Sequence, residues 1–302
     1  MAADLIDPAE LSRLMALPLN ARQAMLGTVS GRHRSPVKGS SIEFAQYRKY
    51  VPGDDTRRLD WRTWGRTDRY YIKEFEADTN LRLCLIVDAS GSMNFPDHAE
   101  GSRHRMGFAR QLGGTLAHLA ARQGDAVGLW GVGAAHRERI PARRGPSHLG
   151  LVMERLADLR PEGGTTILES MHAAAEEIRQ RALVVVASDF FVPPEELKEA
   201  LQHLRFRRHD VALFHLLDPV EIDFNMERPA RFLDVEEGES MLVDPSLISR
   251  RYREVVHSYL EHMDAVVRET AVDYQRVMLT ERPADVLASF LLSRLQRGRG
   301  GR

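Results

Sequence analysis

The stretch "LRLCLIVD" (residues 81–88) predicts a buried central strand, and the polar run "ASGSM" (residues 89–93) follows it directly. The strand is apolar on both faces towards its end, as a strand of a parallel sheet covered on both sides should be. Asp88, Ser90 and Ser92 place a carboxylate and two hydroxyls, each one residue apart, where this strand ends. In doubly wound sheets, ligands bind beyond the carboxyl ends of the strands. The stretch therefore predicts both a fold class and the place of a site.

From this stretch onwards, strands and helices alternate in the chain. Strands such as "ALVVVASD" and "DVALFHLL" are separated by segments with helical spacing, such as "SHLGLVMERLADL". This alternation predicts an α/β domain with a doubly wound, mainly parallel sheet and helices on both faces. We expect the domain to span residues 80–296, after a smaller N-terminal mixed α/β segment (residues 1–79) and before a disordered tail (residues 297–302). A hairpin with its turn near Gly238 interrupts the alternation.

Composition excludes several classes of protein. The chain has 302 residues, and its 42 basic residues nearly balance its 43 acidic ones, so no global charge favours nucleic acid or an anionic membrane. The single cysteine, Cys84, excludes an internal disulfide framework and favours a reducing compartment. The N-terminus lacks the basic region of a signal peptide, and no apolar run approaches the roughly 20 residues that span a bilayer. We expect a soluble, cytoplasmic protein without a membrane span.

The N-terminal segment contains a stretch in which arginines and aromatic residues are mixed. Within residues 31–73 these include Trp61, Trp64, Tyr70 and Tyr71, an arrangement that could bind RNA by stacking and charge. Four aspartates lie among the same arginines, so internal salt bridges and hydrogen bonds account for most of the charge. We therefore expect no nucleic-acid partner, and RNA binding through this segment stays an alternative.

Three separate stretches bring oxygen ligands to the same edge of the predicted sheet. Besides the first strand end, they are the glycine loop "GGTT" (residues 163–166), which opens a helix, and Asp189, which ends "VVVASD". None of these side chains offers sulfur or imidazole. Hard divalent cations take such ligands, and Mg²⁺ usually keeps several waters beside one or two carboxylates. A carboxylate from another protein could displace one of those waters.

The arrangement resembles a known fold and a known family. D-x-S-x-S after a strand, G-G-T before a helix and S-D after a later strand are similar to the von Willebrand factor type A fold with its metal-ion-dependent adhesion site. The longer signature "EF...R.Y.PGDD.R..DW" is similar to the bacterial family called domain of unknown function 58, over roughly residues 30–295. The resemblance implies that an ion, Mg²⁺ or Mn²⁺, is held by Asp88, Ser90, Ser92 and Thr165, with Asp189 helping through water.

Two of these residues also have structural interpretations. Thr166 and Glu169 have the spacing of a capping box and could serve only to start the helix, so we assign the metal role to Thr165. Asp189 could itself cap the helix that begins in "FFVPPEEL", and the metal role is the interpretation that we favour.

The resemblance also implies partners. Genes of the family commonly accompany MoxR-type AAA+ ATPases, which are thought to help assemble or mature other proteins. We therefore expect a metal-dependent protein–protein interaction module. It would bind an acidic side chain of such an ATPase, or of a client that the ATPase remodels.

Enzyme interpretations find little support in the sequence. The stretch "DASGS" has Ala89 where a nucleophile elbow G-x-S-x-G needs glycine, and neither the Walker nor the dinucleotide-binding glycine pattern follows a predicted strand. A dehalogenase-like phosphatase would need aspartate at position 90, where this chain has Ser90. A bound Mg²⁺ could still activate water towards a phosphate ester, so a Mg²⁺-dependent hydrolase stays an alternative. We expect no enzymatic activity.

Overall fold

The computed structural model describes most of the chain. The described residues are 8–19, 43–50, 60–67, 69–76, 81–96, 99, 101–133, 137–225, 230–233 and 240–300. The expected hairpin turn near Gly238 lies outside these residues.

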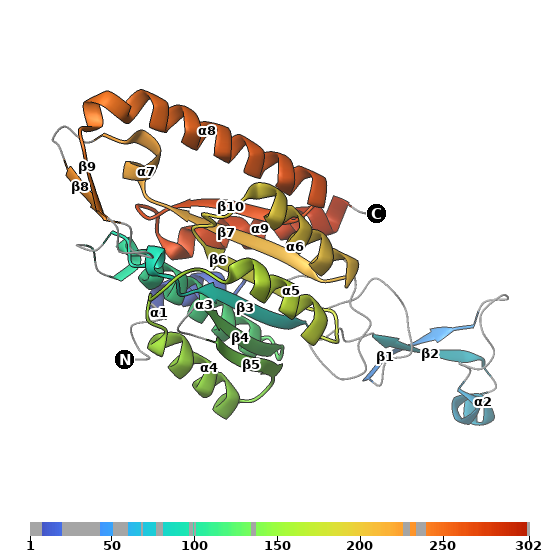
Figure 1. Ribbon diagram of the computed structural model, residues 1–302. Helices are drawn as coiled ribbons and strands as arrows, with labels where there is room; N and C mark the ends of the chain where they lie inside the picture. The colour runs from blue at the N-terminus through green and yellow to red at the C-terminus, as the bar shows by residue number, and fades with distance from the viewer. Residues whose placement is uncertain are drawn as a thin grey trace.

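A six-stranded sheet forms the centre of the molecule (Figure 1). In spatial order its strands are β10 (Asp273–Met278), β7 (Asp210–Leu217), β6 (Leu183–Ser188), β3 (Arg82–Asp88), β4 (Ala126–Val132) and β5 (Arg137–Arg143). All neighbours are parallel except the edge strand β5, which is antiparallel to β4. This is the strand order of a doubly wound sheet, in which the chain leaves β3 first towards one edge and later towards the other. The predicted α/β, von Willebrand factor type A-like fold class is confirmed.

The central strands are buried because apolar residues occupy both of their faces. In β3, β4, β6 and β7, every residue except Arg82 is buried. Alternate side chains point to opposite faces, so each strand contributes to two separate hydrophobic clusters. Leu83, Leu85 and Val87 enter one cluster, whereas Cys84 and Ile86 enter the other.

Helices cover both faces of the sheet (Figure 1). The cluster that contains Leu85 is closed by α1 (Pro8–Leu14), α3 (Arg105–Arg122), α4 (Pro146–Asp158) and α9 (Pro283–Gly300). The cluster that contains Ile86 is closed by α5 (Ile167–Glu177), α6 (Pro194–Phe206) and α8 (Pro245–Thr270). Each layer buries an apolar helix face against the sheet, which is the arrangement that the alternating sequence pattern predicts.

Shorter elements border the edge where the parallel strands end. Two 3-10 helices, η3 (Gly91–Met93) and η4 (Gly101–Arg103), lie between β3 and α3. The helix α7 (Pro219–Asp223) follows β7, and its N-cap Asp218 forms a capping box with Glu221. The predicted hairpin is present as β8 (Ala230–Leu233) and β9 (Ser240–Val243), which pair antiparallel.

The N-terminal segment has two parts. The helix α1 packs against the domain, and Leu14 and Leu19 join the core. The antiparallel pair β1 (Glu43–Lys49) and β2 (Tyr71–Glu76), with the helix α2 (Trp61–Thr67) between them, lies beyond the edge where the parallel strands begin (Figure 1). The domain boundary at residue 79 stays a prediction.

The C-terminal tail differs from the expectation. Residues 297–300 continue α9 instead of forming a disordered tail. Arg297 forms an ion pair with Asp273 of β10, which also pairs with the buried Arg294. This contact gives the end of the helix a partner that the arginine- and glycine-rich composition did not suggest. Residues 301–302 lie outside the described part of the chain.

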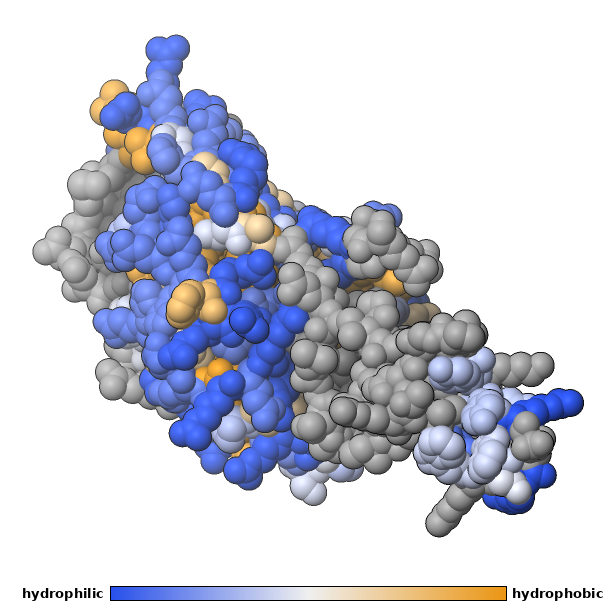
Figure 2. Space-filling view, turned by 90° about the vertical axis from the view of Figure 1, so that its right-hand side faces the viewer, coloured by the Kyte–Doolittle hydropathy of each residue, from blue (hydrophilic) through white to orange (hydrophobic). Residues whose placement is uncertain are grey.

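The surface beside the beginning of the parallel strands is mainly hydrophilic where the structure describes it (Figure 2). Hydrophobic side chains are scattered across this face. Among the described helices, none combines the length and the apolar character needed to cross a membrane.

Candidate cation site

The candidate site lies where the winding of the sheet reverses. The chain leaves β3 towards β4, whereas β6 lies on the other side of β3. Asp88 is the last residue of β3, and Asp189 directly follows β6. Ligands of open α/β sheets bind in the crevice at such a switch point. The sheet therefore brings together two carboxylates that are far apart in the sequence.

Asp88 is surrounded by hydrogen-bond donors. Its side chain is buried, and Oδ1 accepts a hydrogen bond from the backbone N–H of Ser90 at 3.0 Å. Oδ2 accepts one from the hydroxyl of Ser188 at 2.7 Å and a longer one from the hydroxyl of Thr165 at 3.3 Å. Within the described residues no cationic side chain pairs with Asp88. The described partners of its charge are therefore neutral donors.

The two loops that carry the predicted ligands are held together by their backbones. Gly91 N–H donates to Gly163 O at 2.7 Å, and Glu162 N–H donates to Ala89 O at 2.9 Å. Gly163 has a φ of 72°, a conformation that glycine adopts without steric cost. The glycine of "GGTT" is thus used for the close approach of the two loops. Between them, the hydroxyls of Ser90 and Ser92 lie 3.0 Å apart.

The two threonines of this loop have different roles from those that helix capping predicts. Thr166 is the N-cap residue of α5, but its side chain makes no capping hydrogen bond, so the expected capping box with Glu169 is absent. The hydroxyl of Thr165 instead accepts a hydrogen bond from Ile167 N–H at 3.3 Å. The same hydroxyl points to Asp88. Thr165 therefore joins the start of the helix to the site.

Asp189 lies in the site but is engaged by a buried cation. Arg105, the first residue of α3, donates from Nη1 to Asp189 Oδ2 at 3.1 Å and to Ser92 O at 2.8 Å. The other end of its guanidinium forms an ion pair with Glu221 of α7. Asp189 does not cap α6, whose N-cap is Pro193. The site therefore contains an arginine that we did not expect.

Two phenylalanine rings and burial isolate this arginine from water. Arg105 is 1% exposed, and its guanidinium carbon lies 5.1 Å from the ring centre of Phe95 and 5.3 Å from that of Phe191. A charge in such a position is tolerated when it is paired and hydrogen-bonded. The pairing with Asp189 and Glu221 meets that condition and links the site to α7.

The surroundings of Asp88 oppose its ionisation when no cation is bound. Burial raises the pKa of Asp88 to about 6, and the negative charge of Asp189 adds to this shift. Hydrogen bonds from Ser188 and Ser90 act in the opposite direction. A buried carboxylate of this kind gains from a nearby positive charge, because a cation would offset the cost of burying its ionised form.

The donor set suits a small, hard cation. Ligands 2.0–2.1 Å from an octahedral Mg²⁺ lie about 3 Å from their neighbours in the shell. Two distances are close to that value. The Ser90 and Ser92 hydroxyls lie 3.0 Å apart, and Thr165 Oγ1 lies 3.3 Å from Asp88 Oδ2. Among the described residues, no group of three or more histidine, cysteine, aspartate or glutamate side chains could hold a metal ion. A cation here would therefore depend on hydroxyls and water rather than on a cluster of carboxylates.

The aromatic residues of the N-terminal segment lie away from this site. Trp61 and Trp64 of α2 are 58% and 38% exposed, and the ring of Trp64 stacks on that of Tyr70 at 6.0 Å between centres. The helix α2 lies beyond the edge where the parallel strands begin (Figure 1), whereas Asp88 is the last residue of β3. The segment therefore does not line the candidate site.

The fold and the position of the site define the class of the protein, a von Willebrand factor type A-like α/β domain with a polar site at its switch point. A family model described as "Protein of unknown function DUF58" matches residues 46–262. This match spans more than half of the chain, and the chain belongs to that family. The resemblance to this family seen in the sequence is confirmed, whereas the metal-ion-dependent adhesion site stays a prediction.

Individual proteins also resemble this chain. It is similar to the uncharacterized protein Mb1516 of Mycobacterium bovis, with 26% identity over 253 residues that cover 82% of this chain and 78% of that protein. It is similar to the uncharacterized protein YeaD of Bacillus subtilis, with 27% identity over 180 residues, which are 58% of this chain and 40% of YeaD. Among solved structures, an aerotolerance-related membrane protein from Bacteroides fragilis has 16% identity and a TM-score of 0.49, covering 73% of this chain and 100% of that chain.

Proposed function

We propose that the protein is a metal-dependent protein–protein interaction module. A divalent cation, Mg²⁺ or Mn²⁺, would be held by Asp88, Ser90, Ser92 and Thr165. Asp189 would help through a water molecule. The cation would present an open coordination position to an aspartate or glutamate of a partner protein. The observation that carries this proposal is the convergence of three separate chain segments on the buried carboxylate of Asp88.

Charge supports the recognition of a carboxylate. Asp189 is already paired with Arg105, so Asp88 is the carboxylate that can neutralise a bound cation directly. One carboxylate leaves a divalent ion with a net positive charge. An acidic side chain of a partner would complete the shell, and the surrounding loops would supply the rest of the contact area.

The groups that touch the site favour a binding function over a catalytic function. Besides Asp88, the titratable groups in the network are Asp189, Arg105 and Glu221, and both of these carboxylates are held by the arginine. A general base must reach a proton in the reacting complex, and these paired groups are poorly placed for that role. The proposal therefore assigns no catalytic residue.

The partner that we propose is a MoxR-type AAA+ ATPase or a client on which that ATPase acts. This step depends on the resemblance to the family and on the acidic ligand that the site would accept. The protein would then serve as an adaptor in the assembly or maturation of other proteins, and it would work as a soluble, cytoplasmic component.

A pull-down experiment tests the proposal. The purified protein is used as bait in lysate of its own source, with Mg²⁺ or with a chelator, and the candidate ATPase is then tested as a pure protein. We expect partners that require the cation and that Asp88→Ala loses. Glu154→Ala serves as the control, because Glu154 is an exposed carboxylate on α4. Partners that are indifferent to both the chelator and Asp88→Ala would refute the adhesion mechanism.

The same protein preparations test the two alternatives. Turnover of a phosphate ester that disappears in Ser90→Ala would establish the Mg²⁺-dependent hydrolase. Salt-dependent retention on RNA that is lost in the double variant Trp61→Ala, Trp64→Ala would establish nucleic-acid binding, because phosphate contacts weaken as salt rises.

A further inference from the structure

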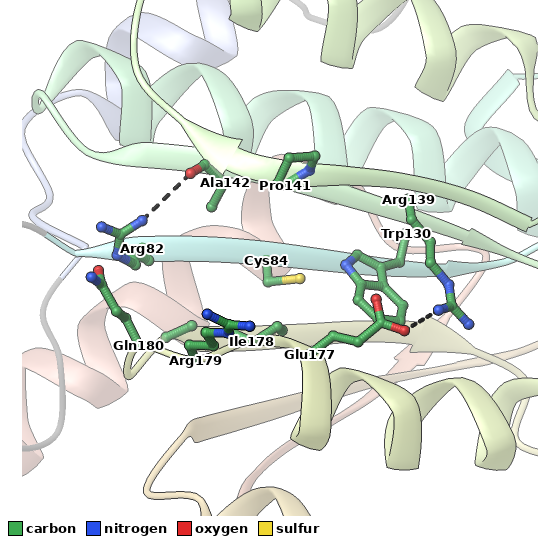
Figure 3. A pocket seen from close by; sticks show the side chains of 11 residues that line it. Arg82, Cys84, Trp130, Arg139, Pro141, Ala142, Glu177, Ile178, Arg179 and Gln180 are labelled. Atoms are coloured by element: carbon green, nitrogen blue, oxygen red, sulfur yellow. Dashed lines mark hydrogen bonds and ion pairs between the residues drawn. The ribbon is translucent and has the colours of Figure 1, made fainter.

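A cavity lies near the beginning of the central strand, away from the candidate cation site. It has a volume of about 500 Å³ and opens between β3, β5 and the end of α5 (Figure 3). Arg82 and Cys84 come from the beginning of β3, whereas Asp88 ends the same strand. The cavity is thus separate from the candidate cation site.

The floor of the cavity is apolar. It contains the thiol of Cys84, the indole of Trp130 and the side chains of Ile178, Pro141 and Ala142 (Figure 3). Cys84 and Trp130 are 3% and 5% exposed, so the sheet holds them in fixed positions. Small-molecule sites are commonly apolar hollows of about 300–1,000 Å³ with a few polar groups. The volume and the floor fit that description.

Positive charge dominates the rim. Arg139 pairs with Glu177, and its guanidinium carbon lies 4.7 Å from the ring centre of Trp130. Arg82 and Arg179 line the end of the cavity away from this pair (Figure 3). Neither has a carboxylate partner within the described residues, and Arg82 makes only a 3.4 Å hydrogen bond to Ala142 O. Within the described part of the chain, the rim therefore carries two guanidinium groups without a carboxylate partner beside an apolar floor.

The position of Arg82 adds to the attraction for an anion. Burial and the nearby positive charge of Arg144 lower the pKa of Arg82, because both make its charge less favourable. A bound carboxylate or phosphate would offset both effects, because an opposite charge favours the charged form. Guanidinium groups bind these anions with paired hydrogen bonds.

We propose that this cavity binds a small organic anion with an apolar body, whose carboxylate or phosphate lies between Arg82 and Arg179 and whose body lies against Cys84, Trp130 and Ile178. The ligand would enter from the edge where the strands begin. Its site differs from the cation site in place and in charge, and the proposal does not depend on the proposed adhesion function.

Trp130 provides a direct measurement of binding. The chain has three tryptophans, at positions 61, 64 and 130, so the variant Trp61→Phe, Trp64→Phe leaves Trp130 as the only one. Octanoate, octyl phosphate and 1-octanol are titrated below their micelle concentrations, and Trp130 emission and calorimetric heat are followed. We expect a saturable change with at least one of the two anions and at least tenfold weaker binding of octanol. Binding of only one anion would identify the preferred head group.

Variants of the cavity separate this site from general hydrophobic binding. Arg82→Gln with Arg179→Gln should weaken anion binding at least tenfold, and Ala142→Phe should abolish it by filling the cavity. Arg250→Gln, on the exposed surface of α8, should leave it unchanged. Circular dichroism checks that each variant is folded, and a chelator should have no effect. Equal binding of octanol, no saturable signal, or binding that survives both cavity variants would overturn the proposal.

Discussion

The two ends of β3 differ in charge and in construction. At its carboxyl end, Asp88 is buried among hydroxyl and amide donors from three chain segments. Near its beginning, Arg82 lies at the rim of an apolar cavity with Arg179 and Arg139. One end is therefore suited to a cation and the other to an organic anion.

The difference shows how the two ends of one sheet can offer two unlike environments. The carboxyl end is shaped by the reversal of the winding, because the loops after β3 and β6 must diverge there. The other end depends on the length of α5, which stops at Glu177 before it covers the beginning of β3 and leaves the cavity open. Topology positions the first site, and local helix length positions the second.

The largest expected effect comes from comparing the buried ion pair near the carboxyl end of β3 with the exposed ion pair near its beginning. Arg105→Met should lower the free energy of unfolding by about 3–5 kcal/mol, because it leaves the buried carboxylate of Asp189 without its cation. The exposed Arg139–Glu177 pair at the cavity gives the matched variant Arg139→Met, which should cost about 1 kcal/mol or less. Urea denaturation measures both changes. Equal losses would mean that burial does not distinguish the two ends.

We expect the effect of Mg²⁺ on the free energy of unfolding to depend only on the carboxyl end of β3. At a Mg²⁺ concentration a hundredfold above its dissociation constant, binding to the folded protein should add about 2.7 kcal/mol to the free energy of unfolding. Asp88→Asn should remove this increment, whereas Arg82→Gln should retain it. Denaturation with and without Mg²⁺ measures the difference. A Mg²⁺ increment that survives Asp88→Asn would place the cation elsewhere.

We expect acid to lower the stability of the protein through His209, which lies at the edge where the strands begin. This residue is buried, and its Nδ1 accepts a hydrogen bond from Ala182 N–H at 3.2 Å, which requires the neutral ring. Burial, with the charges of Arg207 and Arg181, lowers the pKa of His209 from 6.5 to about 4. Between these values the unfolded chain binds more protons, so His209 should make stability fall as pH falls from 6.5 to 4, by up to about 1.4 kcal/mol per unit.

The variant His209→Asn tests this dependence, because its amide oxygen can still accept from Ala182 N–H. Its free energy of unfolding should vary less between pH 6.5 and 4 than that of the unmodified protein. His257→Asn, at an exposed position of α8, should not change the slope. An unchanged slope in His209→Asn would show that this histidine does not contribute.

The smallest expected effect concerns a single hydroxyl. Thr165→Val should weaken Mg²⁺ binding by about 0.5–1.5 kcal/mol, a factor of roughly 2 to 12, since it removes one oxygen donor and keeps the size of the side chain. Thr165→Ser should restore most of the affinity. Calorimetric titration with Mg²⁺ measures both. If Thr165→Val binds as the unmodified protein does, Thr165 only supports the start of α5.

The central fold was predictable because its signals are local and consistent. The apolar runs that end at Asp88 and in "VVVASD" identify central strands, and helical spacing lies between them. The helix α2 was not predicted, because aromatic residues, threonines and Gly65 in "WRTWGRT" are poor helix formers. The sequence signal for the start of this helix is Asp60, because aspartate favours the N-cap position. In the structure its side chain accepts a hydrogen bond from the Thr63 hydroxyl at 2.8 Å.

The site residues that could be predicted are those that follow the end of a predicted strand. Asp88, Ser90 and Asp189 follow from their positions after strands, and the structure brings them to one edge. Arg105 was missed because nothing in the sequence distinguishes a buried arginine at a helix start from an exposed one. The partner Glu221 had a usable signal, because Asp218 and Glu221 have capping-box spacing and mark a helix beside the site.

The connection between the antiparallel pair β1–β2 and the domain has a mechanical consequence. β2 ends at Glu76 and β3 begins at Arg82, so this pair joins the central strand at the end remote from Asp88. A partner that pulled on the pair would load β3 along its own axis. β3 is hydrogen-bonded to β4 and to β6 along its length, and these bonds would have to shear together. Traction applied at one end of the molecule would thus leave the loops around Asp88 at the other end in place.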